Sequence, residues 1–395
     1  MTRVSKRLNK LPHYTVNELA TAKKRMLAQG VDVIDLSVGD ADIPPPQIAV
    51  SMLTEALADQ AMSRYSFQIG LIEFREAVAR YMKRRFDVTV DPMTEVLPLI
   101  GSKNGLSHLP FAILDSGDIC IIPEPGYPGY FGTYLSDAEV LPYPLKASKD
   151  FLIELDDLSD DQLSRTGLVF LNYPNNPTSA IAPRDYLERT VALCREHDIV
   201  LAYDNPYCEM TFDGYKAPSI LELPEARDVT LEFHSLSKSF CMTGWRLGWA
   251  TGSADLIAAL QKVKSYMDTG PFLAVQKAGA AVLDSAETLV ESMQREFTER
   301  RDAAVRSFRD AGFEVEPPKA TMYLWIETPE GLPSAQFAQR VLEEEGVVVL
   351  PGSALGGSGE GYFRIAMTVG ADRMQQAAER IGHVLNQIRT VGARA

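Results

Sequence analysis

An α/β fold with a mostly parallel sheet and helices on both of its faces is predicted by this sequence. Apolar runs of strand length alternate with longer amphipathic segments through the middle of the chain. Repeated strand–helix–strand units favour parallel strands. The pattern changes after about residue 284, where charged amphipathic helices and short strand-like runs predict a smaller α+β domain.

The large domain is expected to contain four buried strands and at least two helices. Leu187, Val191 and Leu193 repeat on one side of a helix expected over residues 183–197. A second, apolar helix is expected over 106–114, after a glycine-flanked turn. The strands are expected at 118–125, 167–174, 199–206 and 229–235.

The smaller domain is expected to combine both ends of the chain. Its helices are predicted at 287–311, 333–345 and 372–390, and its strands at 322–326 and 347–350. We therefore expect a large domain over 46–284 and a small domain made of 1–45 and 285–395.

Bulk composition excludes several classes of function. The chain has 395 residues, 46% of them hydrophobic, and a net charge of −14, which argues against nucleic-acid and anionic-membrane partners. No apolar run is long enough to span a bilayer, and the basic start lacks the apolar core of a signal peptide, so a cytoplasmic location is expected. Neither a metal site nor a disulfide framework is indicated by the scattered cysteines, Cys120, Cys194, Cys208 and Cys241.

Polar side chains follow each of the four predicted strands. Because ligands bind beyond the carboxyl ends of parallel strands, these residues are expected to converge on one site. They are Tyr127, Asn176, Asp204, Tyr207, Ser235, Ser237 and Lys238.

The segment 234–248, HSLSKSFCMTGWRLG, is the most informative in the chain. Lys238 follows two serines at the end of an apolar run, and Arg246 stands between Gly244 and Gly248. Hydroxyls, backbone amides and one guanidinium form an anion-binding cup beside an amine. An amine beside an anion-binding cup suits a ligand that carries both an aldehyde and a phosphate. The segment resembles the cofactor lysine segment of the class I/II aminotransferases, which are fold-type I pyridoxal-phosphate (PLP) enzymes.

This resemblance implies roles for the residues around the cofactor ring. Lys238 is expected to bond the aldehyde and then to move a proton as a general base. Asp204 is expected to keep the pyridine nitrogen protonated. Asn176, in a motif similar to the family's NPTG turn, and Tyr207 are expected to bind the phenolic oxygen. Ser179 stands where the family usually has glycine.

The resemblance also assigns the phosphate site and the aromatic residue that stacks on the ring. Tyr127, in PEPGYPGY, matches the stacking aromatic. The expected phosphate-binding residues are Ser102, Lys103, Ser235, Ser237 and Arg246.

The expected substrate site and a second subunit follow from the same resemblance. Arg364 matches the arginine that clamps the α-carboxylate, with the backbone of Gly39 close by and Asn176 beside them. Tyr14 is expected in the substrate pocket, and Tyr323 either there or in the core.

Tyr65 matches a tyrosine that reaches the neighbouring subunit's phosphate, and 268–271 resembles another loop that crosses between subunits. A homodimer with shared active sites is therefore implied.

The longer motifs look like the LL-diaminopimelate aminotransferase branch, although Asn104 stands where that branch has glutamate and Ala41 where it has proline. The implied reaction transfers an amino group from an amino acid, possibly LL-diaminopimelate, to 2-oxoglutarate by a ping-pong mechanism. Relatives acting on alanine, succinyl-diaminopimelate or other amino acids are alternatives, as are a C–S lyase and an oxidative deaminase.

Two further classes fit poorly. A nicotinamide-binding Rossmann domain lacks its GxGxxG turn here. A regulatory module fused to a DNA-binding domain lacks room for that domain before the first motif.

Overall fold

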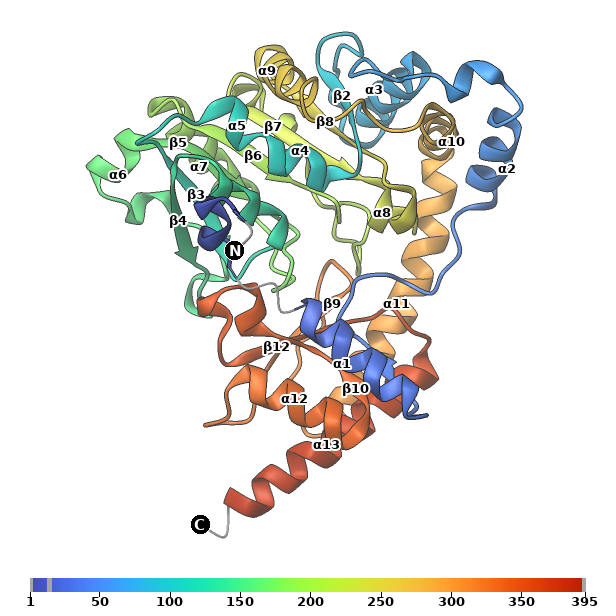
Figure 1. The fold of residues 1–395 in the computed structure, drawn as a ribbon, viewed down its shortest axis with the longest axis vertical. Helices are drawn as coiled ribbons and strands as arrows, with labels where there is room; N and C mark the ends of the chain where they lie inside the picture. The colour runs from blue at the N-terminus through green and yellow to red at the C-terminus, as the bar shows by residue number, and fades with distance from the viewer. Residues whose placement is uncertain (1–2, 13–15, 393–395) are drawn as a thin grey trace.

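A twisted seven-stranded sheet forms the upper part of the molecule (Figure 1). The computed structural model describes residues 3–12 and 16–392. Five strands, in the order β4-β3-β5-β6-β7, are parallel, and β8 runs antiparallel between β7 and β2. The predicted mostly parallel sheet is therefore confirmed. The strands are β2 (Val96–Leu99), β3 (Ile119–Glu124), β4 (Glu139–Pro144), β5 (Thr166–Leu171), β6 (Val200–Asp204), β7 (Thr230–Ser235) and β8 (Gly248–Gly252).

Both faces of this sheet are covered by apolar side chains from helices. On one face, Phe74 and Tyr81 pack with Val169 and Tyr203 of the strands. The helices on this side are α2 (Gln47–Ala56), α3 (Ile72–Phe86), α7 (Arg184–Glu196) and α10 (Leu273–Asp284). The other face packs against α4 (Ser102–His108), α5 (Pro110–Ile113) and α9 (Ala254–Lys264). Alternation along each strand supplies both layers.

The C-terminal part of the chain forms a second core below the sheet (Figure 1). Strands β11 (Leu350–Pro351), β12 (Tyr362–Ala366) and β9 (Tyr323–Glu327) make an antiparallel sheet. The helices here are α11 (Ala286–Asp310), α12 (Ser334–Glu345) and α13 (Ala371–Gly392).

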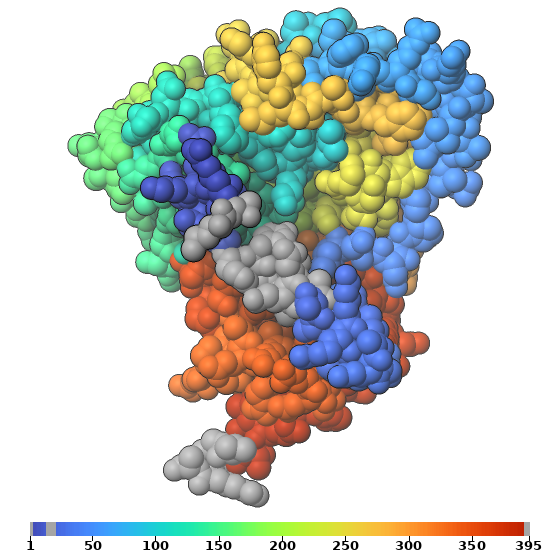
Figure 2. All heavy atoms as spheres, in the orientation of Figure 1, coloured from blue at the N-terminus to red at the C-terminus, as the bar shows by residue number. Residues whose placement is uncertain are grey.

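The N-terminal helix is α1 (Val16–Ala28). Its later part, residues 21–28, lies on this lower part in the space-filling view (Figure 2), where Met26 packs on Leu342. The domain boundaries at 45/46 and 284/285 stay a prediction.

Two predicted elements are divided in the structure. The helix expected over 106–114 is broken at Pro110, which has no N–H to continue α4 and instead begins α5. The strand expected over 347–350 is two strands in different sheets. Its first half, β10 (Val347–Val348), pairs with β1 (Ile34–Asp35), and its second half is β11, paired with β12.

The remaining short helices are α6 (Asp160–Arg165) and α8 (Leu236–Ser239), and the second of these contains Lys238. Over residues 3–12 and 16–392, no helix combines the length and the apolar character that crossing a bilayer requires.

Candidate active site

One cavity of about 310 Å³ at the carboxyl ends of the parallel strands collects almost all of the predicted site residues. Tyr14 lies outside the described residues, and Tyr65 is 73% exposed and does not line the cavity. The predicted residues that line it are Gly39, Ser102, Lys103, Tyr127, Asn176, Asp204, Tyr207, Ser235, Ser237, Lys238, Arg246 and Arg364.

Asp204 ends β6 and carries a carboxylate with one free oxygen. Its Oδ2 accepts a hydrogen bond of 2.6 Å from the Tyr130 hydroxyl, whereas Oδ1 is buried and has no partner among the described residues. Burial raises the pKa of this carboxyl to about 7, although Tyr130 and His234 both act to lower it. A buried acceptor without a donor is suited to a ligand N–H, such as a protonated ring nitrogen.

Lys238 lies in α8, directly after β7, and its amine points toward the residues that follow β1. The Nζ atom donates a hydrogen bond to the carbonyl oxygen of Gly39. A Cβ atom at Gly39 would lie 2.2 Å from the Tyr323 hydroxyl oxygen, so any larger residue there would have to displace the Tyr323 side chain. The lysine and the glycine backbone thus share one end of the cavity.

Arg246 lines the side of the cavity next to Ser102 and Ser237. Its Nη1 donates to Ser237 Oγ at 3.2 Å and to the Thr243 carbonyl at 2.7 Å. The residue has a left-handed φ of 54°, which is unusual for a long side chain. Its Nη2 packs over Gly101, where a Cβ atom would lie only 2.3 Å away. The guanidinium is therefore held in place beside Ser237 and the start of α4.

Arg364 comes from β12 and is buried. Its Nη1 donates to Asn176 Oδ1 at 2.7 Å and its Nη2 to the Ser37 carbonyl at 2.5 Å. The guanidinium carbon lies 4.2 Å from the centre of the Tyr323 ring. The structure thereby brings Arg364, Asn176 and the segment containing Gly39 together, as a carboxylate clamp requires.

Two tyrosine hydroxyls meet in the cavity. Tyr207 Oη and Tyr323 Oη are 3.0 Å apart. Burial, together with the neighbouring Tyr323, raises the pKa of Tyr207 well above its ordinary value. Burial also opposes ionisation of Tyr323, but Lys238 and Arg364 beside it hold its pKa below the ordinary value. Tyr207 therefore stays a neutral hydrogen-bond donor, and Tyr323 is both buried and part of the cavity wall.

The turn that carries Asn176 accommodates its unusual serine. Ser179 has a positive φ of 60°, the conformation that a glycine would adopt without cost. Its hydroxyl bonds Thr321 Oγ1 at 2.6 Å and the Tyr323 carbonyl at 2.9 Å. These bonds stabilise the turn without the usual glycine.

Lys103 and Tyr127 form a further wall of the cavity. Lys103 Nζ lies 6.0 Å from the centre of the Tyr127 ring. Burial and the charge of Arg246 lower the pKa of Lys103. Asn104 stands where the diaminopimelate branch has glutamate. Its side chain contacts the ion pair of Lys264 and the partly buried Asp268, donating to Asp268 Oδ2 at 3.0 Å and accepting from Lys264.

The sequence interpretation missed several residues of the site. Tyr130, the partner of Asp204, is only three residues beyond Tyr127, in the same motif, and that proximity was the available signal. The Asn172 side chain donates to the backbone carbonyl of Asp204 at 2.8 Å and accepts from the backbone N–H of Asn176, also at 2.8 Å, so it joins two predicted site residues. The other lining residues are Ser37, Val38, Asp40, Pro128, Pro206, Thr243, Leu350 and Leu355.

The donor set of this cavity fits PLP. A free buried carboxylate oxygen on Asp204 matches the ring nitrogen, and Lys238 supplies the amine that an aldehyde needs. Arg246, Ser235 and Ser237 supply donors for a phosphate. Over residues 3–12 and 16–392, no cluster of three or more histidine, cysteine or acidic side chains is arranged to hold a metal ion.

The chain is similar to known proteins over most of its length. The family model "Aminotransferase class I and II" matches residues 31–381. LL-diaminopimelate aminotransferases of Moorella thermoacetica and Syntrophobacter fumaroxidans are 43% and 44% identical. These alignments cover 97% and 95% of this chain and 99% and 97% of those proteins.

Solved structures give the same result. BacF of Bacillus subtilis has a TM-score of 0.94 at 33% identity, over 97% of this chain and 98% of its own. A probable N-succinyldiaminopimelate aminotransferase of Thermus thermophilus has a TM-score of 0.88 at 36% identity, over 93% and 99%.

The fold and the site thus define a PLP-dependent aminotransferase of fold type I. The chain belongs to the class I and II aminotransferase family. Its enzyme class and cofactor, predicted from the family resemblance, and its α/β fold, predicted from the alternation of strands and helices, are confirmed.

Proposed function

We propose that this aminotransferase takes the amino group of LL-diaminopimelate and passes it to 2-oxoglutarate by a ping-pong mechanism. The observation that carries this proposal is the 43–44% identity, over nearly the full chain, to proteins named LL-diaminopimelate aminotransferase. Both half-reactions use the same cavity, because donor and acceptor each carry an α-carboxylate for Arg364.

The residues of the cavity divide the work between them. When bound, PLP supplies an aldehyde that bonds to amines and a ring that withdraws electrons from the donor's α carbon. Lys238 holds that aldehyde and then, as a free amine, takes the α proton. Asp204, whose Oδ1 has no partner among the described residues, would accept a hydrogen bond from the ring nitrogen, and Tyr207 would donate one to the phenolic oxygen. Arg364 binds the α-carboxylate through both of its terminal nitrogens.

A panel of half-reactions tests the donor. Each candidate donor is mixed alone with the PLP-loaded protein, and conversion of the cofactor to its aminated form is followed by absorbance. LL-diaminopimelate is expected to convert it at the highest kcat/KM. Alanine, aspartate or N-succinyl-diaminopimelate reacting faster contradicts the substrate assignment.

The alternative reactions release different products. A C–S lyase releases a thiol from a cysteine-type donor, and an oxidative deaminase releases ammonia and consumes oxygen. Neither reaction leaves the cofactor in an aminated form that a 2-oxo acid could convert back to PLP. Failure of 2-oxoglutarate and pyruvate to restore the PLP absorbance therefore contradicts ping-pong transfer.

We also propose a homodimer in which Tyr65 reaches the partner's phosphate. The supporting observation is an apolar surface on two joined segments. Ser66 Oγ donates to the Thr269 carbonyl at 2.7 Å. Exposed apolar side chains of this kind mark interaction surfaces. On these segments they are Tyr65, Phe67, Ile69, Ile72, Tyr266, Met267 and Phe272.

Subunit mixing tests this arrangement. Homodimers of the Lys238→Ala variant and homodimers of the Tyr65→Ala variant are both expected to have impaired activity. If Tyr65 acts across subunits, a mixed dimer contains one site with both residues intact, and mixing restores activity. Absence of recovery in dimers that have demonstrably exchanged subunits contradicts the shared site. The cytoplasmic location stays a prediction.

A further inference from the structure

Two buried carboxylates, those of Glu209 and Glu232, anchor the loop that carries Tyr207 on the side away from the cavity. Residues 205–209 connect the end of β6 to a short bridge at Thr211. Tyr207 faces the cavity, whereas the side chains of Asn205, Cys208 and Glu209 point into the protein interior. Neither carboxylate lines the cavity or has a part in the chemistry described above.

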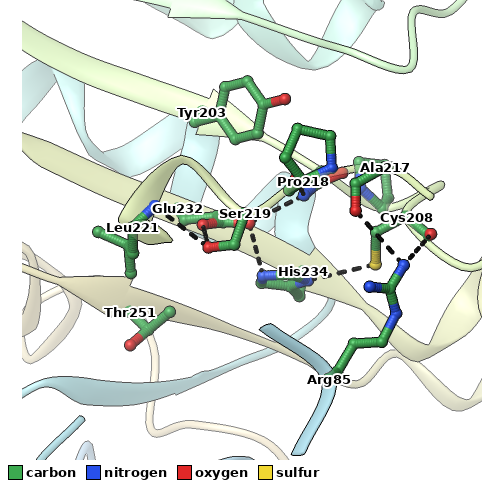
Figure 3. Close-up of polar contacts among 12 residues, drawn as sticks. Arg85, Tyr203, Cys208, Ala217, Pro218, Ser219, Leu221, Glu232, His234 and Thr251 are labelled. Carbon is green, nitrogen blue, oxygen red and sulfur yellow. Dashed lines mark hydrogen bonds and ion pairs between the residues drawn. The ribbon is translucent and has the colours of Figure 1, made fainter. Parts of the chain in front are cut away.

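Glu232 fastens the first end of the loop. It lies in β7, is 0% exposed, and accepts a hydrogen bond of 2.8 Å from Asn205 Nδ2. Ser219 also donates to it, and His234 Nε2 lies 3.0 Å from its Oε1 without an aligned hydrogen bond. The close-up view shows Glu232 beside Ser219 and His234 (Figure 3). The thiol of Cys208 lies 3.7 Å from His234 Nδ1 in the same view.

Glu209 fastens the other end of the loop. It is 3% exposed, and it accepts hydrogen bonds of 2.5 Å from the Tyr81 hydroxyl and 3.0 Å from Arg85 Nε. Both donors belong to α3. Arg85 also donates to the Cys208 carbonyl at 3.3 Å (Figure 3). The backbone on either side of Tyr207 is thereby tied to a helix and to the sheet.

The charges in this region are balanced. Burial opposes the charged form of His234, but Glu232 beside it raises its pKa to about 10. Arg85 is the cation beside Glu209. Buried ion pairs give little net stability relative to apolar side chains of similar size, because both charges must leave water. Their directional bonds do, however, fix one position of the loop.

We propose that Glu209 and Glu232 are positioning residues that act as a two-point clamp on loop 205–209 and hold the Tyr207 hydroxyl against the phenolic oxygen of PLP. The clamp acts through Tyr207 and touches neither cofactor nor substrate. This inference rests on the proposed role of Tyr207.

The pH titration of the bound cofactor's absorbance tests the clamp. Tyr207→Phe removes a hydrogen bond to the phenolic oxygen, a bond that favours the deprotonated form of the bound cofactor. The apparent pKa of the absorbance change is therefore expected to rise by about one unit. Glu209→Gln and Glu232→Gln are expected to raise it by about half a unit or more. Combined with Tyr207→Phe, neither should add a further shift, because all act on the same bond.

Two further variants separate positioning from stability. Tyr81→Phe removes one hydrogen bond from Glu209 while keeping its ion pair, and a smaller shift in the same direction is expected. Glu95→Gln is the matched control, since it removes the 2.8 Å ion pair of Glu95 with Arg227, which lines no part of the cavity. It should lower the unfolding temperature and leave the absorbance titration unchanged.

Two results overturn the clamp. If the Glu209 and Glu232 variants only unfold more easily and keep the wild-type titration, the network is merely structural. If Tyr207→Phe itself keeps the wild-type titration, the role of Tyr207 fails and the clamp fails with it. Donor conversion by the wild-type protein is unaffected by either result, so it reports on the proposed function separately.

Discussion

Replacement of Asp204 by asparagine is expected to stabilise the cofactor-free protein at alkaline pH. Asp204 is 2% exposed, and burial raises its pKa from 3.8 to about 7. Because this pKa is raised in the folded state, the folded protein binds the proton more tightly than the unfolded chain does. The free energy of unfolding therefore falls as the pH rises from 3.8 to about 7, and it stays low above that range.

The size of the effect follows from that difference in pKa. A rise from 3.8 to about 7 corresponds to about 4 kcal/mol at alkaline pH. Asparagine is uncharged and avoids this loss, and its Oδ1 can still accept the Tyr130 hydrogen bond. The Nδ2 of asparagine takes the place of Asp204 Oδ1, which has no hydrogen-bond partner among the described residues. If Nδ2 also lacks a partner, its burial costs about 1–3 kcal/mol. A net stabilisation of about 1–3 kcal/mol is expected above the folded-state pKa.

Urea unfolding of both cofactor-free proteins measures this effect. Between pH about 5 and about 8, the advantage of Asp204→Asn should grow by about 3 kcal/mol. The same variant should bind PLP about 10–100-fold more weakly, because a charge-assisted hydrogen bond to the ring nitrogen is lost. A stability difference that does not change with pH would refute the assigned titration of Asp204.

Three other substitutions test the remaining walls of the cavity. Arg364→Ala should raise the KM for the amino donor by about 100-fold, since both hydrogen bonds to the α-carboxylate are lost; steady-state kinetics measure this, and a normal KM would assign that carboxylate to another residue. Arg246→Ala should raise the PLP dissociation constant by about tenfold or more in equilibrium dialysis, and an unchanged constant would place the phosphate elsewhere. Gly101→Ala should weaken PLP binding in the same assay, because the new Cβ would lie 2.3 Å from Arg246 Nη2 at a φ of 69°; wild-type affinity would show that the guanidinium can move freely.

The central strands were predictable from the sequence because they are buried on both faces. β3, β5 and β6 consist largely of apolar residues, which is the pattern that a parallel sheet covered on both sides requires. β7, TLEFHS, also contains Glu232 and His234, which are buried as well. The edge strand β4 was not anticipated, since its sequence EVLPYP contains two prolines and proline is a weak strand former. β8 begins and ends with glycine, and only its pairing with β2 and β7 makes it a strand.

Much of the site was predictable for a similar reason. Residues that follow parallel strands meet at one edge of the sheet, so Asn176, Asp204 and Lys238 converge once the strands are assigned. The contacts between these residues were not predictable. The Tyr130–Asp204 bond joins residues 74 positions apart, and the Arg364–Asn176 bond joins residues 188 apart. Such pairs depend on the packing of whole elements, which local patterns do not contain.

Reduction of the PLP-loaded protein with borohydride, followed by peptide mass spectrometry, tests the central claim most directly. The cofactor mass is expected on the peptide that contains Lys238, and Lys238→Ala should lose it while still folding. An unmodified Lys238 peptide, or the cofactor mass on a different lysine, would contradict the assignment on which the site is built.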